Sequence, residues 1–134
     1  MTVYLDASAV VAAHLDQPAR SIVLDAMRDD ADWCSSGLTL MEALALIDRV
    51  VDEPVLRTDL EDLVRLMWDR IAVVPVDQRC LDRAATLMRE QPLRLSDALH
   101  LAAADRLPRP IRFVTFDPTQ IPVALALGYD VISA

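Results

Sequence analysis

Short apolar runs recur along the chain, and they are separated by longer segments in which apolar residues return at helical spacing. The run Val3-Tyr4-Leu5 reaches the acidic Asp6 at once and has the character of a strand that is buried on both faces. Parallel sheets are built from such strands. The runs predict five strands, at residues 3–5, 33–36, 71–76, 112–116 and 129–132.

The segments between these runs predict helices, because their apolar residues recur with a period of about 3.6. Ser8, Asp77 and Asp117 stand at helix starts and are predicted N-caps. Gly128 is predicted to end the last helix. The predicted helices cover residues 9–15, 39–51, 54–68 and 121–127, together with segments that begin at residues 18, 77 and 96.

Strands that alternate with helices, without repeats or low-complexity linkers, predict one α/β domain with a parallel sheet. In such a sheet the carboxyl ends of the strands meet at one edge, where α/β proteins bind their ligands. Asp6 ends the first predicted strand and Asp117 ends the fourth. Both side chains are therefore expected at that edge.

Two further acids stand in apolar surroundings. Asp97 opens an apolar helix at residues 98–104, and Glu42 carries the only charge in residues 38–47. The helix around Glu42 is apolar on every face, so we expect this carboxylate to be largely buried. An unpaired buried carboxylate costs several kcal/mol, so Glu42 is expected to have a cation or a guanidinium as partner.

Each of these acids also has a structural explanation. Asp6 and Asp117 can cap the helices that follow them, and Asp97 in a first helical turn favours the helix dipole. Carboxylates that converge from strand ends and helix starts repel one another unless a cation lies between them. Taken together, the four acids predict a divalent metal site and metal-assisted hydrolysis.

Composition narrows the possible functions. The net charge of −8 argues against a broad basic face for non-specific DNA binding. All 13 basic residues are arginine, which excludes a Walker A phosphate loop, and two glycines are too few for a dinucleotide-binding loop. Cys34 and Cys80 have neither metal-site spacing nor the density of a disulfide scaffold. With no apolar run near 18 residues and no basic segment at the start, a cytoplasmic protein is expected.

Four stretches of the chain resemble the PIN-domain nucleases, and specifically the VapC-type toxins of bacterial toxin–antitoxin pairs. Their order and spacing fit that family, and so does the length of the chain. The resemblance implies one three-layer PIN domain over residues 1–134, with a central parallel five-stranded sheet flanked by helices. The stretches are residues 5–9, 39–42, 95–102 and 114–117.

The resemblance also implies roles for individual residues. Ser8 and Thr115 match positions that support the site through their hydroxyls, and Thr39 matches the position one helical turn before the glutamate. Arg94 is our candidate for contact with the substrate, although a surface arginine at a helix start is an equal alternative. His100 is interpreted as a core histidine or as a base beside the site. The acids implied to bind Mg²⁺ or Mn²⁺ and to be catalytic are Asp6, Glu42, Asp97 and Asp117.

The implied activity is endonucleolytic cleavage of tRNA, rRNA or mRNA to 5′-phosphate and 3′-hydroxyl ends. The implied partners are a VapB-type antitoxin and a second copy of the chain, bound through the helical face. Two alternatives stay open. The first is a catalytically idle PIN scaffold that binds RNA or a protein. The second is a small phosphatase, although Ser8 stands where the common aspartyl-phosphate enzymes have a second acid.

Overall fold

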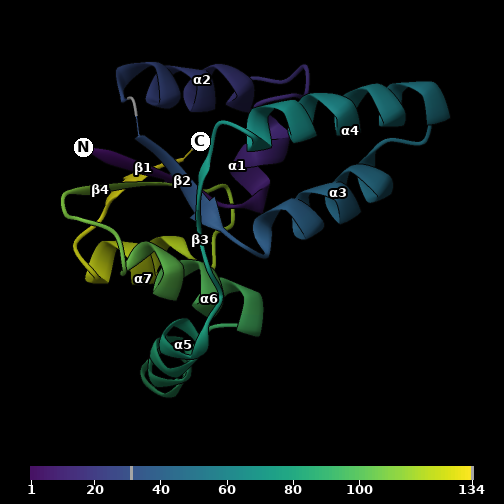
Figure 1. Ribbon diagram of the computed structural model, residues 1–134. Helices are drawn as coiled ribbons and strands as arrows, with labels where there is room; N and C mark the ends of the chain where they lie inside the picture. Colours follow the sequence, from purple (N-terminus) through teal and green to yellow (C-terminus); the bar gives the residue numbers. More distant parts are fainter. Residues whose placement is uncertain (31, 134) are drawn as a thin grey trace.

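The computed structural model describes residues 1–30 and 32–133, which form one five-stranded sheet with helices on both faces (Figure 1). The strands lie in the order β3-β2-β1-β4-β5, and every neighbouring pair is parallel, as predicted. The buried first strand therefore occupies the centre of the sheet. The strands are β1 (Thr2–Leu5), β2 (Asp32–Ser36), β3 (Ala72–Val74), β4 (Ile111–Val114) and β5 (Asp130–Ile132).

The helices make two outer layers, with α1 to α4 on one face of the sheet and α5 to α7 on the other (Figure 1). Successive side chains of a strand point to opposite faces. Val3 and Leu5 thus pack against the first layer, and Tyr4 packs against the second. The helices are α1 (Ala7–Ala12), α2 (Ala19–Asp29), α3 (Thr39–Val50), α4 (Pro54–Trp68), α5 (Gln78–Glu90), α6 (Leu95–Ala104) and α7 (Ile121–Ala126).

Two of the predicted helix caps are wrong. The N-cap of α1 is Asp6 rather than Ser8, because the backbone of Asp6 stays extended and its carboxylate accepts a hydrogen bond from the Ala9 amide. The N-cap of α7 is Gln120 rather than Asp117. The Asp117 carboxylate instead accepts from the amide of Thr119, two residues on, and holds a turn before the helix. Asp77 caps α5 as predicted.

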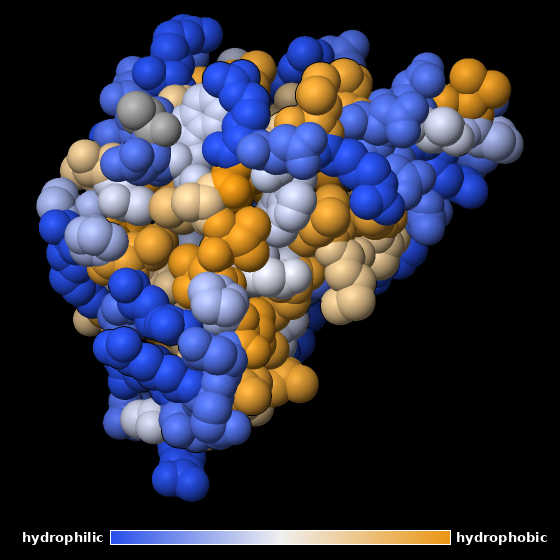
Figure 2. All heavy atoms as spheres, viewed as in Figure 1, coloured by the Kyte–Doolittle hydropathy of each residue, from blue (hydrophilic) through white to orange (hydrophobic). Residues whose placement is uncertain are grey.

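The hairpin of α3 and α4 projects from the first layer and exposes apolar side chains (Figures 1 and 2). Only Thr39, Ala43 and Ile47 of α3 are buried, whereas Met41 is 69% exposed. The apolar character of α3 therefore does not reflect burial on all sides. In the described part of the chain, no helix has the length and apolar character needed to cross a membrane.

Candidate active site

All four acids singled out in the sequence line one pocket at the carboxyl edge of the sheet. They come from four separate segments: the end of β1, the first turn of α3, the first turn of α6 and the turn after β4. A parallel sheet brings such segments together, because its strands all end at the same edge. The other polar residues that line the pocket are Ser8, Arg49, Arg94, Ser96, His100 and Gln120.

Asp6 lies at the bottom of this site and is almost completely buried. One carboxylate oxygen, Oδ1, accepts hydrogen bonds from the Ser8 hydroxyl at 2.6 Å and from the Ala9 amide at 2.9 Å. The other, Oδ2, accepts from the hydroxyl of Thr115 and from the side-chain amide of Gln120 at 3.2 Å. Burial raises the pKa of Asp6 above its ordinary value, although His100 and the hydroxyl donors oppose this effect. The structure thus places Ser8 and Thr115 directly on the Asp6 carboxylate.

Asp97 and Asp117 share two donors. The guanidinium of Arg94 donates from Nε to Asp97 Oδ2 at 3.1 Å and from Nη2 to Asp117 Oδ2 at 2.9 Å. The Thr119 hydroxyl lies 2.8 Å from an oxygen of each acid. Burial disfavours the charge on Asp117, but hydrogen bonds from Thr119 and the nearby Arg94 lower its pKa below the ordinary value.

Glu42 has a histidine as its partner. Its side chain is 27% exposed and so mostly buried, as predicted, but the partner is neither a cation nor a guanidinium; α3 leaves one of its apolar faces in solvent. His100 is itself buried in α6, and its Nε2 lies 2.6 Å from Glu42 Oε1. On the other side of the ring, Nδ1 lies 2.8 Å from the hydroxyl of Tyr4 in β1.

The three side chains form a hydrogen-bonded chain from the core to the pocket. Burial raises the pKa of Tyr4 well above its ordinary value, so the phenol keeps its proton. The arrangement that satisfies all three groups has Tyr4 donating to His100 Nδ1 and the Nε2–H of His100 donating to Glu42. His100 is therefore in contact with the site, a role that the sequence left open.

Thr39 lies further from the acids than Ser8 and Thr115 do. Its hydroxyl is 2.7 Å from the Ser35 hydroxyl and 3.1 Å from that of Ser36, both at the end of β2. Ser35 in turn donates to the backbone carbonyl of Leu5 in β1. Thr39 thus ties the start of α3 to the sheet, and so fixes the helix that carries Glu42.

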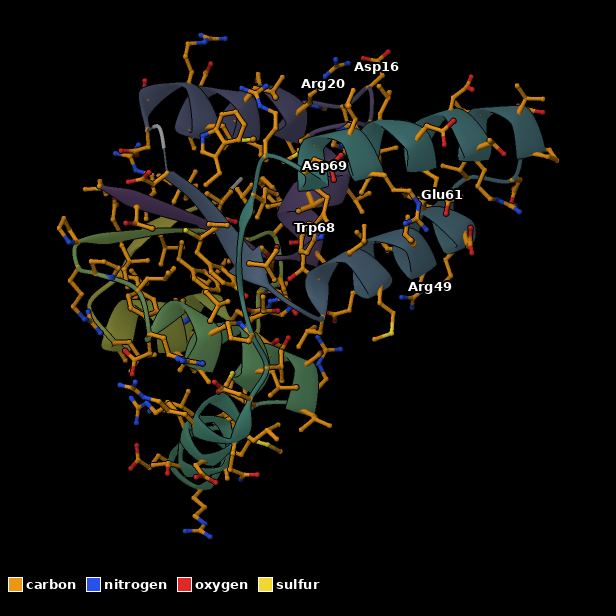
Figure 3. The ribbon with its side chains drawn as sticks, viewed as in Figure 1. Asp16, Arg20, Arg49, Glu61, Trp68 and Asp69 are labelled. Atoms are coloured by element: carbon orange, nitrogen blue, oxygen red, sulfur yellow. The ribbon has the colours of Figure 1, made fainter. Side chains whose placement is uncertain are left out.

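Three further residues of the site escaped the sequence analysis. Gln120 is buried, and its amide nitrogen lies 3.2 Å from both Asp6 and Asp97. Thr119 links Asp97 to Asp117. Arg49 lines the pocket two helical turns after Glu42, and its side chain leaves α3 on the side away from α4 (Figure 3). The spacing of seven residues, which places Arg49 on the same face of α3 as Glu42, is a sequence signal that could have identified Arg49 alone.

The four acids of the pocket offer only oxygen atoms as metal ligands, which suits a hard divalent cation. Within the described residues, however, no three acidic, histidine or cysteine side chains already form a metal-binding group. Arg94, Thr119 and Gln120 hold oxygens of Asp6, Asp97 and Asp117 instead. The residues therefore fit a cation by chemistry and location, although these side chains would compete with it for some of the carboxylate lone pairs.

Residues 3–124 match the family model of the PIN domain. No curated protein sequence matches the chain. Among solved structures, the chain is similar to VapC20 of Mycobacterium tuberculosis, described as a Sarcin-Ricin loop cleaving toxin, with a TM-score of 0.72 and 13% identity over 91% of this chain and 95% of that one.

Two complexes show the same degree of likeness. DNA-bound VapBC from Salmonella typhimurium gives a TM-score of 0.71 and 16% identity, over 99% of this chain and 98% of that one. A toxin–antitoxin complex from Klebsiella pneumoniae gives 0.69 and 16%, over 90% of each chain. The TM-scores establish a shared fold, and identities this low show no more than that.

Proposed function

The chain belongs to the PIN domain family, and from that premise we propose that it is a metal-dependent endoribonuclease, the toxin of a type II toxin–antitoxin pair. The observation that carries the proposal is the convergence of Asp6, Glu42, Asp97 and Asp117 on one pocket. The fold shared with VapC20, a toxin that cleaves the Sarcin-Ricin loop, supports RNA as the substrate class. We assign all of residues 1–134 to this one domain and place its action in the cytoplasm.

The four acids would hold Mg²⁺, or Mn²⁺ as a substitute. A divalent cation in this pocket supplies positive charge to a phosphoryl oxygen and lowers the pKa of an attacking water. The hydroxyls of Ser8 and Thr115 fix the orientation of the Asp6 carboxylate, and His100 fixes that of Glu42. The cleaved RNA would carry 5′-phosphate and 3′-hydroxyl ends.

Arginine must provide the positive charge that contacts the RNA backbone, since the chain has no lysine. Arg49 from α3 and Arg94 from the start of α6 both line the pocket that holds the acids. We therefore add Arg49 to Arg94 as a residue that binds substrate.

An antitoxin of the VapB type is the partner that we propose for this toxin. An apolar pocket beside the acids shares Ser8 and Leu46 with the acidic one and is also lined by Val11, Leu15 and Phe116. A partner segment with apolar residues would fill it, and a basic side chain of that segment would enter the acidic pocket. The toxin–antitoxin complexes with the same fold support such a partner.

We also propose a homodimer that covers exposed apolar side chains of α3 and α4, because isolated domains rarely leave extensive apolar surface in solvent. Met41 of α3 and Leu63 and Leu66 of α4 are all exposed.

Leu63→Glu is expected to convert the dimer to a monomer, because a carboxylate buried at the interface would lack a partner. Light scattering coupled to size-exclusion chromatography measures the mass of the particle in solution. Leu125→Glu, at an exposed position of α7, is the control and should stay dimeric. A monomeric wild type would contradict the proposed dimer.

One observation favours a second function, a PIN scaffold that binds RNA or protein without cleavage. Side chains of the chain itself, Arg94 and Gln120, donate hydrogen bonds to Asp6, Asp97 and Asp117. In that case the pocket would be a structural feature. A scaffold of this kind would bind RNA equally well with and without divalent cations.

Incubation of the purified protein with total bacterial RNA tests the proposed function. We expect fragments to form in Mn²⁺ or Mg²⁺ and cleavage to stop in EDTA. Carboxylates alone provide no Lewis acid that could neutralise charge on the phosphate oxygens. The fragments should be substrates for an exonuclease that requires a 5′-phosphate. Cleavage that persists in EDTA would refute the mechanism, and RNA binding without cleavage would favour the scaffold.

A further inference from the structure

Arg94 bridges two of the four acids across the mouth of the pocket. It stands at the N-cap position of α6, three residues before Asp97, and its side chain is 70% exposed. Its Nε nevertheless donates a hydrogen bond to Oδ2 of Asp97, and its Nη2 donates one to Oδ2 of Asp117. The two acids belong to α6 and to the turn after β4, so the guanidinium joins segments that lie far apart in the sequence.

A cation bound to Asp97 and Asp117 would have to compete with the Arg94 guanidinium for their carboxylate oxygens. An oxygen that points a lone pair at a guanidinium N–H cannot direct the same lone pair at a metal ion. The positive charge of Arg94 also repels any second cation that approaches Asp97 and Asp117. Removal of this charge would therefore strengthen binding of a divalent cation to the two acids.

The rest of the site shows that its present hydrogen bonding is incomplete. Gln120 turns its amide nitrogen toward Asp6 and Asp97, which leaves its carbonyl oxygen buried without a hydrogen-bond partner among the described residues. A buried acceptor without a partner is costly. A half-turn of this amide would direct an oxygen toward the space between the two acids, where a cation would use it.

We propose that Arg94 is a built-in competitor of the metal ion: it closes the Asp97–Asp117 pair in the metal-free chain and swings out when a divalent cation binds. The guanidinium is 70% exposed and regains water when it leaves, and the cation replaces it as the positive partner of the buried carboxylates of Asp97 and Asp117, which are 3% and 20% exposed. Once released, the guanidinium lies at the rim of the pocket and binds an RNA phosphate. The inference rests on the proposed function for its metal and its RNA.

The competition makes a prediction about metal binding alone. Arg94→Gln is expected to bind Mn²⁺ roughly tenfold more tightly than the wild type, within the usual range of coupling between sites. Arg106→Gln is the matched control, because it removes the same charge from another arginine–aspartate pair, with Asp77 at 2.8 Å, outside the pocket. The Mn²⁺ dissociation constant is measured without RNA by the electron paramagnetic resonance signal of the unbound ion.

A second measurement uses the wild-type chain, so it does not depend on how well a variant folds. The Nε–H signal of Arg94 in an NMR spectrum is expected to shift when Mg²⁺ is added, because its hydrogen bond to Asp97 breaks. The corresponding signal of Arg106 should stay in place. An Arg94 signal that is unmoved while Mg²⁺ binds would overturn the inference.

The outcomes separate the two proposals. Equal Mn²⁺ affinity in the wild type and Arg94→Gln would refute the competition and leave the nuclease proposal standing. Equal tightening in Arg94→Gln and Arg106→Gln would show an effect of net charge, and would also refute it. A failure of Mn²⁺ to bind either chain would refute both the competition and the metal site.

Discussion

The Asp6→Asn variant is expected to cleave RNA roughly 10³-fold more slowly than the wild type, since it loses a negative charge at the centre of the site. The fold should survive. Asparagine is as good an N-cap as aspartate, and its side-chain oxygen still accepts from Ser8 and the Ala9 amide. What it lacks is the second anionic oxygen, which faces Thr115 and Gln120 and would ligate the cation.

Two comparisons make this prediction sharp. Glu42→Gln should lose activity to a similar extent, because it removes the negative charge that α3 contributes to the pocket. Asp105→Asn is the control: it removes a carboxylate paired with Arg83 at 2.9 Å, at the far end of α6 from Asp97. Initial cleavage rates and thermal unfolding are measured on all three variants. Full activity in a folded Asp6→Asn variant would contradict the proposed mechanism.

A second large effect is expected from the histidine behind Glu42. His100→Ala should lower the cleavage rate about 10- to 100-fold, as loss of a partner that orients a metal ligand does. The hydrogen bond of 2.6 Å from His100 to Glu42 fixes the carboxylate in the pocket. Without it, Glu42 is free to rotate toward solvent on the exposed side of α3, since its side chain is 27% exposed already.

His100→Gln distinguishes positioning from a purely structural role. The glutamine amide places a donor near the position of Nε2 and should restore much of the activity, while Tyr4 loses its acceptor in both variants. Mn²⁺ affinity should follow the same order as the rate. If the rates of the two variants instead follow only their thermal stability, His100 is a packing residue and the positioning role is wrong.

The centre of the sheet could be predicted from the sequence because β1 and β4 are buried on both faces and therefore appear as largely apolar runs, whereas the edge strands β3 and β5 are partly exposed. The same physics misled the prediction for α3. An apolar helix can be covered by its own domain or left for another chain, and the sequence of one chain does not distinguish the two. Met41 is exposed, and Glu42 is paired with His100 rather than with a cation or a guanidinium.

The location of the acids followed from topology, since residues that end parallel strands meet at one edge. The caps could not be assigned in this way, because Asp6 and Ser8 are both good N-cap residues within three positions. Gln120 and Thr119 carried no signal: a neutral side chain in a turn is unremarkable until two acids lie beside it. The pairing of Arg94 with Asp117 joins residues 23 positions apart and needed the folded chain.

Sequencing of RNA 5′-phosphate ends in bacteria that express the chain shows whether these four acids form a nuclease site. We expect new ends at reproducible positions on induction of the wild type, and none of these ends on induction of Asp6→Asn at equal protein level. Co-expression of the cognate antitoxin should suppress them. The same ends in the Asp6→Asn strain, or no new 5′-phosphate ends with the wild type, would contradict a nuclease built on these four acids.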